Sequence, residues 1–336
     1  MSNPKSKFNV AVVGAGIAGL SCATRLQALG FQVQVYEKSR GPSGRMSTRN
    51  GDGWSADHGA QYFTARDPLF IEALNTWIKA GVAAAWHPRL NVYEANQWHE
   101  STSKDSRYVG VPAMNSPGKY LADKLSIECN QTIDKIYQQH GKWFLHSLES
   151  GDITQSFDYL VLAIPAPQAS ALAKSVDHSM EAFCSSVHMQ GCWTLIARLS
   201  EKANIPFDAA FINNEIISWI SKNNSKPGRT GQETWTIHAN PQWSQQWIEL
   251  DKEEAKQLIL ESAKKLGLDC AKAEIAIHRW RYASGAIHAE MGFIFNADSK
   301  LSLCGDWLNG GRVEGAWLSG YQLASAINIS ATTLNP

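Results

Sequence analysis

The segment Val10–Leu20, VAVVGAGIAGL, constrains the fold of this chain more than any other stretch of its sequence. Apolar residues typical of a buried strand lead into Gly14, Gly16 and Gly19, and a helical pattern follows at once. This order indicates the first strand, turn and helix of a dinucleotide-binding fold, in which the glycines allow a tight turn and close backbone approach to a pyrophosphate. An ordinary glycine-rich turn is the alternative interpretation of the triplet taken alone.

The residues after this motif support a nucleotide site. The helical pattern covers Ile17–Leu29 and is expected to end at Gly30. A second strand, Gln32–Tyr36, then leads to Glu37. Because a carboxylate about 20 residues beyond the glycines accepts hydrogen bonds from ribose hydroxyls in such folds, we expect Glu37 to contact the ribose. A surface glutamate is the alternative.

Composition narrows the classes of function. With 336 residues the chain is long enough for two domains, and 31 basic against 31 acidic residues do not favour nucleic acid or an anionic membrane as a partner. Arg25 and the glycines argue against a membrane span over residues 10–29, where no signal-peptide cleavage pattern is present either. Six scattered cysteines without a C-x-x-C pair favour reduced thiols in the cytoplasm over a disulfide scaffold or a metal site.

A second basic loop follows the second strand. Glycines and a proline over residues 40–49 indicate a loop that brings Arg40, Arg45 and Arg49 towards the expected pyrophosphate. Arg45 is the expected phosphate ligand, because a planar guanidinium matches two oxygens. A basic surface loop is the alternative. A nicotinamide-dependent dehydrogenase does not need this second loop, whereas FAD-binding proteins commonly have one, so the sequence favours FAD.

A third motif, DHGAQYFT, follows the arginine loop. Gly59 and Ala60 are small enough for the backbone to lie against a flat ring. Gln61 and Tyr62 are expected to hydrogen-bond beside that ring or to form a wall of its site. His58 is a candidate proton-transfer group, although a histidine next to an aspartate more often serves as a structural hydrogen-bonding group.

The last informative motif lies near the C-terminus. A strand that ends before Gly305 delivers Asp306, and a helix is expected to begin near Glu314–Ala316. Asp306 is the expected acceptor for the ribityl hydroxyls of a flavin. The helix N-terminus is expected to face the pyrimidine edge of the flavin, where its dipole favours negative charge on the reduced ring. Three motifs in this order predict FAD far more strongly than any one alone.

The rest of the chain divides into periodic segments. From Asp67 the pattern is helical, with Phe70, Leu74, Trp77 and Ile78 expected on one buried face. Further expected elements are a short helix at 119–125, strands at 131–136, 143–148, 157–163, 192–198, 215–220 and 234–239, and a helix over 244–266. The predicted fold is α/β, with a discontinuous FAD-binding domain at 1–66, 116–167 and 291–336 and a substrate domain at 67–115 and 168–290.

The chain resembles the flavin-containing amine oxidase superfamily and, within it, the renalases of the bacterial type. The matching motifs are VGAGIAG (13–19), GPSGRMST (41–48), DHGAQYFT (57–64), AIPAP (163–167), HRWRYA (278–283) and CGDW (304–307). The resemblance implies a Rossmann-type FAD/NAD(P)-binding domain with a mixed-sheet substrate domain, in the topology of p-hydroxybenzoate hydroxylase. It also implies oxidation of the 2- or 6-dihydro isomers of NAD(P)H: a hydride passes to the flavin, NAD(P)⁺ leaves, and molecular oxygen reoxidises the flavin to give hydrogen peroxide.

The motifs and the resemblance together give a predicted site. We expect FAD to be bound non-covalently, because Cys304, the candidate for a covalent link, lies on a strand and should point into the sheet. The predicted FAD-binding residues are Gly14, Ala15, Gly16, Ile17, Ala18, Gly19, Glu37, Lys38, Gly44, Arg45, Met46, Gly59, Ala60, Gln61, Tyr62, Ile133, Gly305, Asp306, Glu314, Gly315 and Ala316. The predicted substrate-pocket residues are Tyr62, His238, Trp280, Arg281 and Tyr282.

Alternatives remain open at this point. No motif contains a convincing general base, in keeping with hydride removal from a dihydropyridine, which leaves no surplus proton. An amine oxidase remains possible, because aromatic side chains can enclose an amine nitrogen, and so does a flavin-binding redox sensor without catalysis. In the run from Arg279 to Tyr282 the arginines alternate with the aromatics, so the four face one pocket only if the strand twists or ends there. Arg279 and Arg281 as surface charges, with Trp280 in the core, are the plain alternative.

Overall fold

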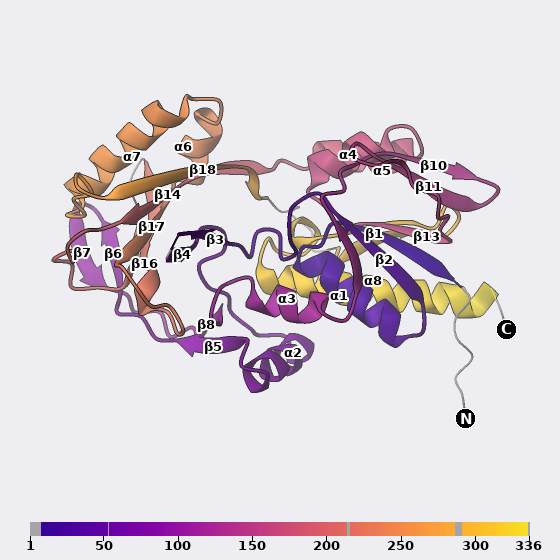
Figure 1. Cartoon of the computed structure of the whole chain (residues 1–336), viewed down its shortest axis with the longest axis horizontal. Helices are drawn as coiled ribbons and strands as arrows, with labels where there is room; N and C mark the ends of the chain where they lie inside the picture. The colour runs from indigo at the N-terminus through magenta and orange to yellow at the C-terminus, as the bar shows by residue number, and fades with distance from the viewer. Residues whose placement is uncertain (1–7, 53, 214–215, 286–290, 335–336) are drawn as a thin grey trace.

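The computed structural model describes residues 8–52, 54–213, 216–285 and 291–334. Figure 1 shows two lobes, one built on a six-stranded sheet and the other on a seven-stranded sheet. Each sheet is mixed, and the chain crosses between the lobes several times. The α/β class with a Rossmann-type domain is therefore as predicted.

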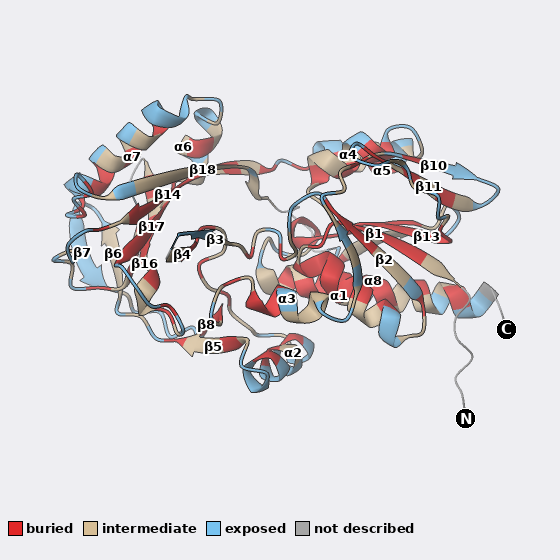
Figure 2. Cartoon of the chain, viewed as in Figure 1, coloured by how far each residue is buried: buried red, intermediate tan, exposed pale blue. Residues whose placement is uncertain are grey.

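The six-stranded sheet has the order β19-β20-β13-β1-β2-β9. Its strands are β1 (Asn9–Val13), β2 (Gln32–Glu37), β9 (Ser126–Cys129), β13 (Tyr159–Leu162), β19 (Phe293–Asn296) and β20 (Leu301–Cys304). All neighbours are parallel except the edge strand β19, which is antiparallel to β20. Strands β13 and β20 are buried along their whole length, as expected for central strands covered on both faces. Figure 2 shows this burial for β13.

Helices cover the two faces of this sheet through alternating side chains. Val10 and Val12 of β1 pack on the side of α1 (Ile17–Ala28), α3 (Ser116–Ala122) and α8 (Val313–Leu334). Ala11 and Val13 pack on the side of α4 (Ala166–Ala173) and α5 (His178–Ser186). A small sheet also covers this second face: β10 (Ile133–Gln139), β11 (Lys142–Ser147) and β12 (Gly151–Asp152).

The seven-stranded sheet has the order β18-β14-β17-β16-β15-β6-β7. Its strands are β6 (Leu90–Glu94), β7 (Gln97–Glu100), β14 (Gln190–Arg198), β15 (Ala209–Ile212), β16 (Ile217–Lys222), β17 (Thr234–Ala239) and β18 (Glu274–Ser284). Neighbours are antiparallel except the pair β15–β6. Helices α6 (Pro241–Gln246) and α7 (Lys252–Lys265) cover its outer face, and its inner face is turned towards the other lobe (Figure 1).

Several short elements complete the two lobes. They are β3 (Thr48–Gly51), β4 (Trp54–Asp57), α2 (Pro68–Lys79), β5 (Ala83–Trp86), β8 (Arg107–Gly110) and two 3₁₀ turns, Asn223–Ser225 and Asp306–Leu308. The β3–β4 hairpin lies between the lobes in Figure 1. Helix α2 packs with Trp317 and Leu318 of α8, together with residues of the seven-stranded sheet such as Trp219. This shared core joins the lobes.

The structure corrects four of the expectations from sequence. Ile78 does not share the buried face of α2, since its exposed fraction is 41%. The single helix expected over 244–266 is two helices, because Asn240 caps α6 and Asp251 caps a separate helix α7 through the N–H groups of residues 253 and 254. The short helix expected at 119–125 begins at Ser116, with a proline in its first turn, and ends at Ala122.

The fourth correction concerns the domain boundaries. Helices α4 and α5, expected in the substrate domain, pack through Met180 and Cys184 on the six-stranded sheet. Their apolar faces were visible in the sequence, but the sheet that they cover was not. Glu215, the expected start of a strand, and the expected boundary at residue 290 both lie outside the described residues.

The contact between α1 and α8 generates a stability prediction. A Cβ atom added at Gly320 would lie 2.0 Å from the carbonyl oxygen of Ala18, so Gly320→Ala forces two packed helices apart. We expect this variant to lose about 1–3 kcal/mol of unfolding free energy in urea titration. The control is Gln322→Ala, on the exposed side of the same helix, with an expected change within about 0.5 kcal/mol. Equal midpoints for the two variants would contradict the packing.

Candidate active site

The turn after β1 meets the requirements of a phosphate site. Gly16 precedes α1, no side chain caps the helix there, and its first turn carries no acidic residue. A Cβ atom at Gly16 would meet nothing within 4 Å, whereas one at Gly19 would lie 2.0 Å from the carbonyl oxygen of Gly14. Open space therefore faces the backbone at the helix start. Because the free N–H groups of a helix N-terminus attract anions, this turn fits the pyrophosphate of a dinucleotide.

Glu37, at the end of β2, is buried beside this turn. Its carboxylate accepts the backbone N–H groups of Ala15 and Ser39, each at 2.8 Å. The carboxylate thereby ties the glycine turn to the second strand. Its neighbour Lys38 is exposed. Ribose binding by Glu37 and any contact of Lys38 stay predictions.

The expected phosphate ligand and the expected ribityl ligand lie side by side. Arg45 forms an ion pair with Asp306 and donates a further hydrogen bond to the carbonyl oxygen of Ala283, at 3.2 Å. Asp306 is buried, and the N–H group of Gly305 before it donates to Ser319 Oγ at 2.9 Å. Since β1, β2 and β20 are parallel, their carboxyl ends bring the glycine turn, Glu37 and Asp306 to one edge, where dinucleotides bind in such folds. This set of donors and acceptors fits FAD.

The remaining predicted cofactor residues lie at or behind this edge. A Cβ at Gly44, whose φ is +53°, would lie 3.2 Å from the Cα of Gly16, so the arginine loop packs closely on the glycine turn. The carboxylate of Glu314 accepts the N–H groups of residues 66 and 67, each at 2.6 Å, and so ties the start of α8 to the loop before α2. The others are buried or half-buried: Ala15, Ile17, Ala18, Met46, Ile133, Gly315 and Ala316.

A buried cluster of charges anchors the third motif. Asp57 is fully buried and forms ion pairs with Arg229 at 2.6 Å and Lys226 at 3.2 Å. It also accepts hydrogen bonds from Thr48 Oγ1 at 2.7 Å and from the Met114 N–H at 3.0 Å. Burial alone would raise the pKa of Asp57, but the two cations hold it below its ordinary value. Burial lowers the pKa of Lys226 to about 8, although the negative charge of Asp57 acts to raise it.

Gln61 connects this cluster to the backbone of the motif. Its Nε2 donates to the carbonyl oxygens of Asp57 at 2.8 Å and Gly59 at 3.1 Å. Its Oε1 accepts from Ser221 Oγ at 2.8 Å and Lys226 Nζ at 3.0 Å. The amide is therefore fully engaged within the protein. The expectation that it hydrogen-bonds to a flavin ring does not match this geometry, and Gln61 instead positions the Gly59–Ala60 backbone.

A cavity of about 330 Å³ opens between this motif and the inner face of the seven-stranded sheet. It is lined by Gly59, Ala60, Gln61, Tyr62, Phe211, Ser218, Trp219 and His238. The ring centroid of Trp219 lies 5.5 Å from that of Tyr62 and 4.8 Å from that of Phe211. Of these eight described residues, none is acidic. The cavity thus offers flat aromatic walls and two small residues, which suits a planar ligand.

Strand register brings the sheet side of this site together. Phe211 pairs with Trp219, Trp219 with His238, His238 with Thr194, and Thr194 with His278, across five strands. Directly opposed residues share a face, so this row lines the inner face. The neighbouring residues of these strands point outwards to α7. Sequence reasoning found His238 but missed Phe211, Ser218 and Trp219, because local alternation does not reveal which strands are neighbours.

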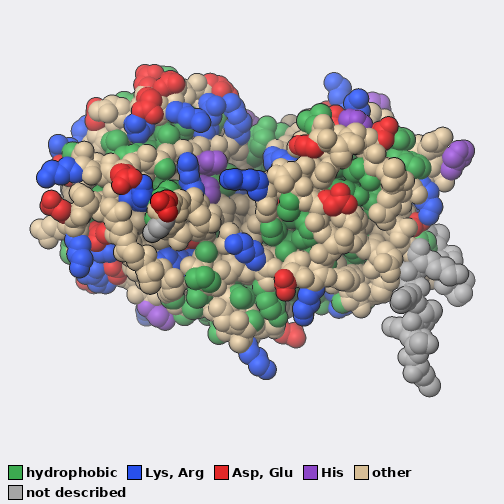
Figure 3. Space-filling view, viewed as in Figure 1, with side chains coloured by type: hydrophobic (Ala, Val, Ile, Leu, Met, Phe, Trp, Pro, Cys, Tyr) green, Lys and Arg blue, Asp and Glu red, His purple; other side chains and the backbone are tan. Residues whose placement is uncertain are grey.

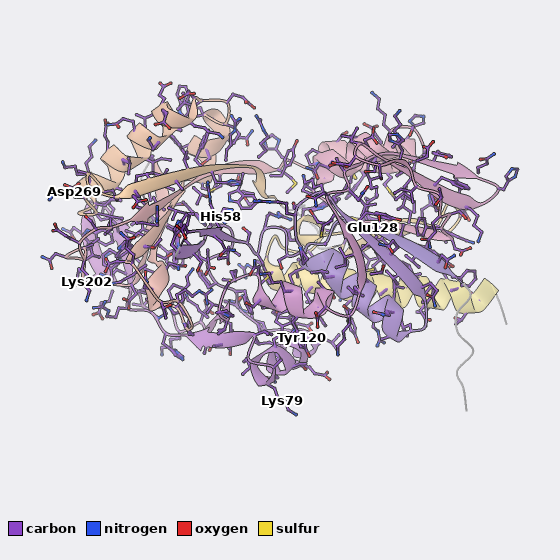
Figure 4. The ribbon with its side chains drawn as sticks, viewed as in Figure 1. His58, Lys79, Tyr120, Glu128, Lys202 and Asp269 are labelled. Carbon is purple, nitrogen blue, oxygen red and sulfur yellow. The ribbon has the colours of Figure 1, made fainter. Side chains whose placement is uncertain are left out.

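Three histidines and a tryptophan lie beside the cavity. The His58 ring lies 5.0 Å from His278 and 5.1 Å from Trp280, and its backbone oxygen accepts the Trp280 indole N–H at 3.1 Å. His238 Nε2 lies 3.3 Å from the same oxygen. Burial lowers the pKa of His58 to about 4, with a further contribution from His278, and burial lowers the pKa of His238 to about 4. Both rings are neutral at pH 7. Figure 4 labels His58 between the lobes, and Figure 3 shows histidine and basic side chains there.

The other three predicted pocket residues, Trp280, Arg281 and Tyr282, lie on β18 but do not face the same site. Trp280 lies on the inner face, two residues along β18 from His278 and with its ring 5.1 Å from that of His58, whereas Arg281 is half-exposed and pairs with Glu249. The expectation that Arg281 meets the substrate is therefore wrong for this geometry, because alternation along the strand turns it to the opposite face. Tyr282 packs against the core of the six-stranded sheet.

Among the residues that the structure describes, no cluster of histidine, cysteine or acidic side chains is arranged to hold a metal ion. Within the same part of the chain, no helix is both long and apolar enough to cross a membrane.

Two protein families match the chain in succession. Residues 12–76 match the family described as NAD(P)-binding Rossmann-like domain, and residues 77–328 match the family described as flavin containing amine oxidoreductase. Together these matches cover both lobes. The second match alone spans well over half of the chain and includes the whole lining of the cavity on the seven-stranded sheet.

Individual relatives are similar in part. A zeta-carotene-forming phytoene desaturase from Myxococcus xanthus is 50% identical over 59 residues, which is 18% of this chain and 11% of the desaturase. A cyclohexylamine oxidase from Brevibacterium oxydans has a TM-score of 0.74 at 13% identity, over 98% of this chain and 100% of the oxidase. A wild-type putrescine oxidase bound to putrescine gives the same TM-score and identity, over 95% and 98%. At such low identity, the solved structures establish the fold alone.

The charge cluster generates a stability prediction. Asp57→Asn leaves Lys226 and Arg229 buried without their counter-charge, so we expect about 3–5 kcal/mol less unfolding free energy in urea titration. The control is Asp105→Asn, whose partner Arg66 is exposed, and no measurable change is expected there. An unchanged midpoint for Asp57→Asn would show that the cluster does not hold the motif in place.

The low pKa of His58 predicts how stability depends on pH. Between about pH 4 and its ordinary value of 6.5, the unfolded state binds a proton that the folded state does not, so stability falls as the pH is lowered. We expect His58→Asn to reduce the loss of unfolding free energy between pH 7 and 4.5 by about 2–3 kcal/mol. His140→Asn, in an exposed turn, should retain the wild-type slope. Parallel slopes for all three proteins would refute a neutral buried His58.

Proposed function

We propose, from the premise that this chain belongs to the flavin containing amine oxidoreductase family, that its substrate is an isomeric dihydro-NAD(P). The chain is an FAD-dependent oxidoreductase of that family. The proposal adds that it oxidises the 2- or 6-dihydro forms, releases NAD(P)⁺ and uses molecular oxygen as acceptor, as in the renalases that its motifs resemble. When bound, FAD supplies the two-electron acceptor for this reaction.

The character of the cavity carries the proposal. Its lining includes aromatic side chains and His238, which is neutral at pH 7, and no acid among the described residues. Hydride removal from a dihydropyridine leaves no surplus proton, so it needs no base. Oxidation of an amine, by contrast, requires the neutral form of a group that arrives as an ammonium ion. The lining holds no carboxylate to receive that proton, and His238, whose pKa is lowered to about 4, is only a weak base, so the site favours the dihydropyridine.

Buried cations near the cavity support the same choice. The guanidinium carbon of Arg107 lies 5.3 Å from the ring centroid of Tyr62, and Arg107 is 7% exposed. Lys226 Nζ lies 3.0 Å from the Oε1 atom of Gln61. Positive charge in a region of low dielectric opposes the entry of an ammonium ion but admits a neutral, electron-rich ring. The same charges oppose retention of the pyridinium product and so favour its release.

The residues of the chain have distinct parts in this proposal. Gly16, Glu37, Arg45 and Asp306 hold FAD along the carboxyl ends of the strands. The backbone at 59–60 lies against the flat ring and is kept in position by Gln61 and the Asp57 cluster. Tyr62, Trp219 and Phe211 stack on the substrate and exclude water.

The proposal includes non-covalent FAD and a cytoplasmic location. Cys304 is fully buried in the core between the sheet and α1, next to Cys22, so its thiol is directed away from the carboxyl edge of the sheet. All six cysteines are free thiols.

An amine oxidase is the second candidate. Tyr62, Trp219 and Phe211 form an aromatic enclosure of the kind that can hold an amine nitrogen, and the fold is shared with amine oxidases such as the putrescine-bound enzyme. The missing acid in the lining argues against it for a substrate with a second charged amine.

The direct test is anaerobic stopped-flow absorbance of the bound flavin at about 450 nm. The FAD-loaded protein is mixed with isomerised NADH that contains the 2- and 6-dihydro forms, with ordinary NADH, or with a panel of primary amines. We expect rapid bleaching by the isomers alone, together with release of NAD⁺. Bleaching by the amines alone would assign the chain to amine oxidation, and bleaching by neither would refute both candidates.

A further inference from the structure

Arg49 belongs to the basic loop whose cations the sequence directs to the FAD pyrophosphate, but the structure places it against the other lobe. It lies on β3, whose hairpin with β4 stands between the lobes, and it pairs there with Ala56 (Figure 1). Its Nη1 atom lies 3.5 Å from the carbonyl oxygen of Ile277 on β18. Arg45, by contrast, pairs with Asp306 at the carboxyl ends of the parallel strands. The proposed function therefore leaves Arg49 without a part.

The guanidinium of Arg49 has no counter-charge in the part of the chain that the structure describes. Its side chain is exposed, and no carboxylate oxygen of the described residues lies within 4 Å of its nitrogen atoms. Seven other arginines do form ion pairs with carboxylates: Arg45, Arg66, Arg89, Arg198, Arg229, Arg279 and Arg281. Because a free guanidinium presents a planar fork of N–H donors, Arg49 is suited to bind a phosphate.

Positive charge gathers around Arg49 at the edge of the seven-stranded sheet that β18 forms. His278 follows Ile277 on this strand, and its ring lies 5.0 Å from that of His58. Burial lowers the pKa of both histidines, and the positive charge of Arg49 lowers it further, so the guanidinium lies near both rings. Lys252, at the start of α7, is a second cation that acts on His278. We call Arg49, His278 and Lys252 the β18 edge.

The cavity itself can hold only one end of a dinucleotide. Its volume of about 330 Å³ is near the lower limit for pockets that enclose small molecules, about 300 Å³. None of its eight described lining residues is a lysine or an arginine. Since burying an anion without a counter-charge is unfavourable, the diphosphate of a dihydronicotinamide dinucleotide is expected to lie outside the cavity.

The β18 edge lies within reach of a nicotinamide ring in the cavity. His238, which lines the cavity, and His278 belong to one cross-strand row, with Thr194 of β14 between them. Neighbouring strands are about 4.8 Å apart, so the two histidines are about 10 Å apart along the sheet. From the ring nitrogen through the ribose to the first phosphorus there are as many bonds as in two residues of extended backbone, about 7 Å. The diphosphate that follows can therefore meet Arg49.

We propose that Arg49 binds the diphosphate of the substrate at the β18 edge and thereby selects dinucleotides over nicotinamide compounds without phosphate. The inference rests on the proposed function and deepens it. Arg49 does not contact the reacting ring, so it determines specificity and is not a catalytic residue. Because its contact with the diphosphate is the same in the ground state and the transition state, it strengthens binding without changing the rate of hydride transfer.

The test compares two substrates on the FAD-loaded protein under anaerobic conditions. One is isomerised NADH, and the other is isomerised reduced nicotinamide riboside, which carries the same ring and ribose but no phosphate. The rate of flavin bleaching at increasing substrate concentration gives a half-saturating concentration and a limiting rate. We expect the wild type to reach half-saturation at an about tenfold lower concentration of the dinucleotide, with similar limiting rates. Equal half-saturating concentrations in the wild type would overturn the proposal.

Arg49→Gln isolates the charge, since it replaces an exposed side chain by another polar one. We expect the half-saturating concentration of the dinucleotide to rise about tenfold, while that of the riboside and both limiting rates stay unchanged. The matched control is Arg89→Gln. It removes an exposed guanidinium that pairs with Asp208 beside β6, towards the opposite edge of the same sheet. The control should behave as the wild type does with both substrates.

The outcomes separate this inference from the proposed function. If the isomers reduce the flavin and Arg49→Gln leaves half-saturation by the dinucleotide unchanged, only the role of Arg49 is refuted. An equal rise for the dinucleotide and the riboside would refute it too, because a lost phosphate contact affects the dinucleotide alone. If neither substrate reduces the flavin in the wild type, the proposed function fails, and this inference fails with it.

Discussion

The buried ion pairs of Asp57 are the interaction on which the geometry of the site depends. Asp57 ends β4, and its partners Lys226 and Arg229 follow β16, so one carboxylate joins the linking hairpin to the seven-stranded sheet. Burying these two cations and one anion would lower the stability of the fold if the charges did not compensate one another and form hydrogen bonds. Gln61 extends the cluster to the backbone that walls the cavity. The cluster therefore determines the position of the 59–60 backbone relative to Phe211 and Trp219 on the seven-stranded sheet.

The seven-stranded sheet supplies two chemically different surfaces from one set of strands. Alternation sends Leu195 and Ile237 outwards to α7, while Thr194 and His238 face the other lobe. The outer surface is apolar and stabilises the lobe. The inner surface is aromatic and polar, and it is available for recognition. This division explains how Trp280 lines the site although Arg281, one residue away, pairs with a carboxylate in solvent.

Local sequence was sufficient where a local constraint determines the structure. The turn requires glycine at Gly14, whose φ is +104°, and at Gly19, where a Cβ atom would lie 2.0 Å from the Gly14 carbonyl oxygen, so the motif revealed the nucleotide edge. Alternation along β18 likewise indicated that arginines and aromatics face opposite ways. Trp219 and Lys226 were missed because their positions depend on strand register and on ion pairs with residues more than 150 positions away. Helices α4 and α5 were assigned to the wrong domain for the same reason, because their apolar faces did not indicate which sheet they cover.

The most direct measurement is a crystal structure of the FAD-loaded protein with NAD⁺. We expect FAD along the carboxyl ends of β1, β2 and β20, and the nicotinamide ring in the cavity between the 59–60 backbone and Trp219. A nicotinamide bound outside the cavity would contradict the assignment of this site to dihydronicotinamide recognition.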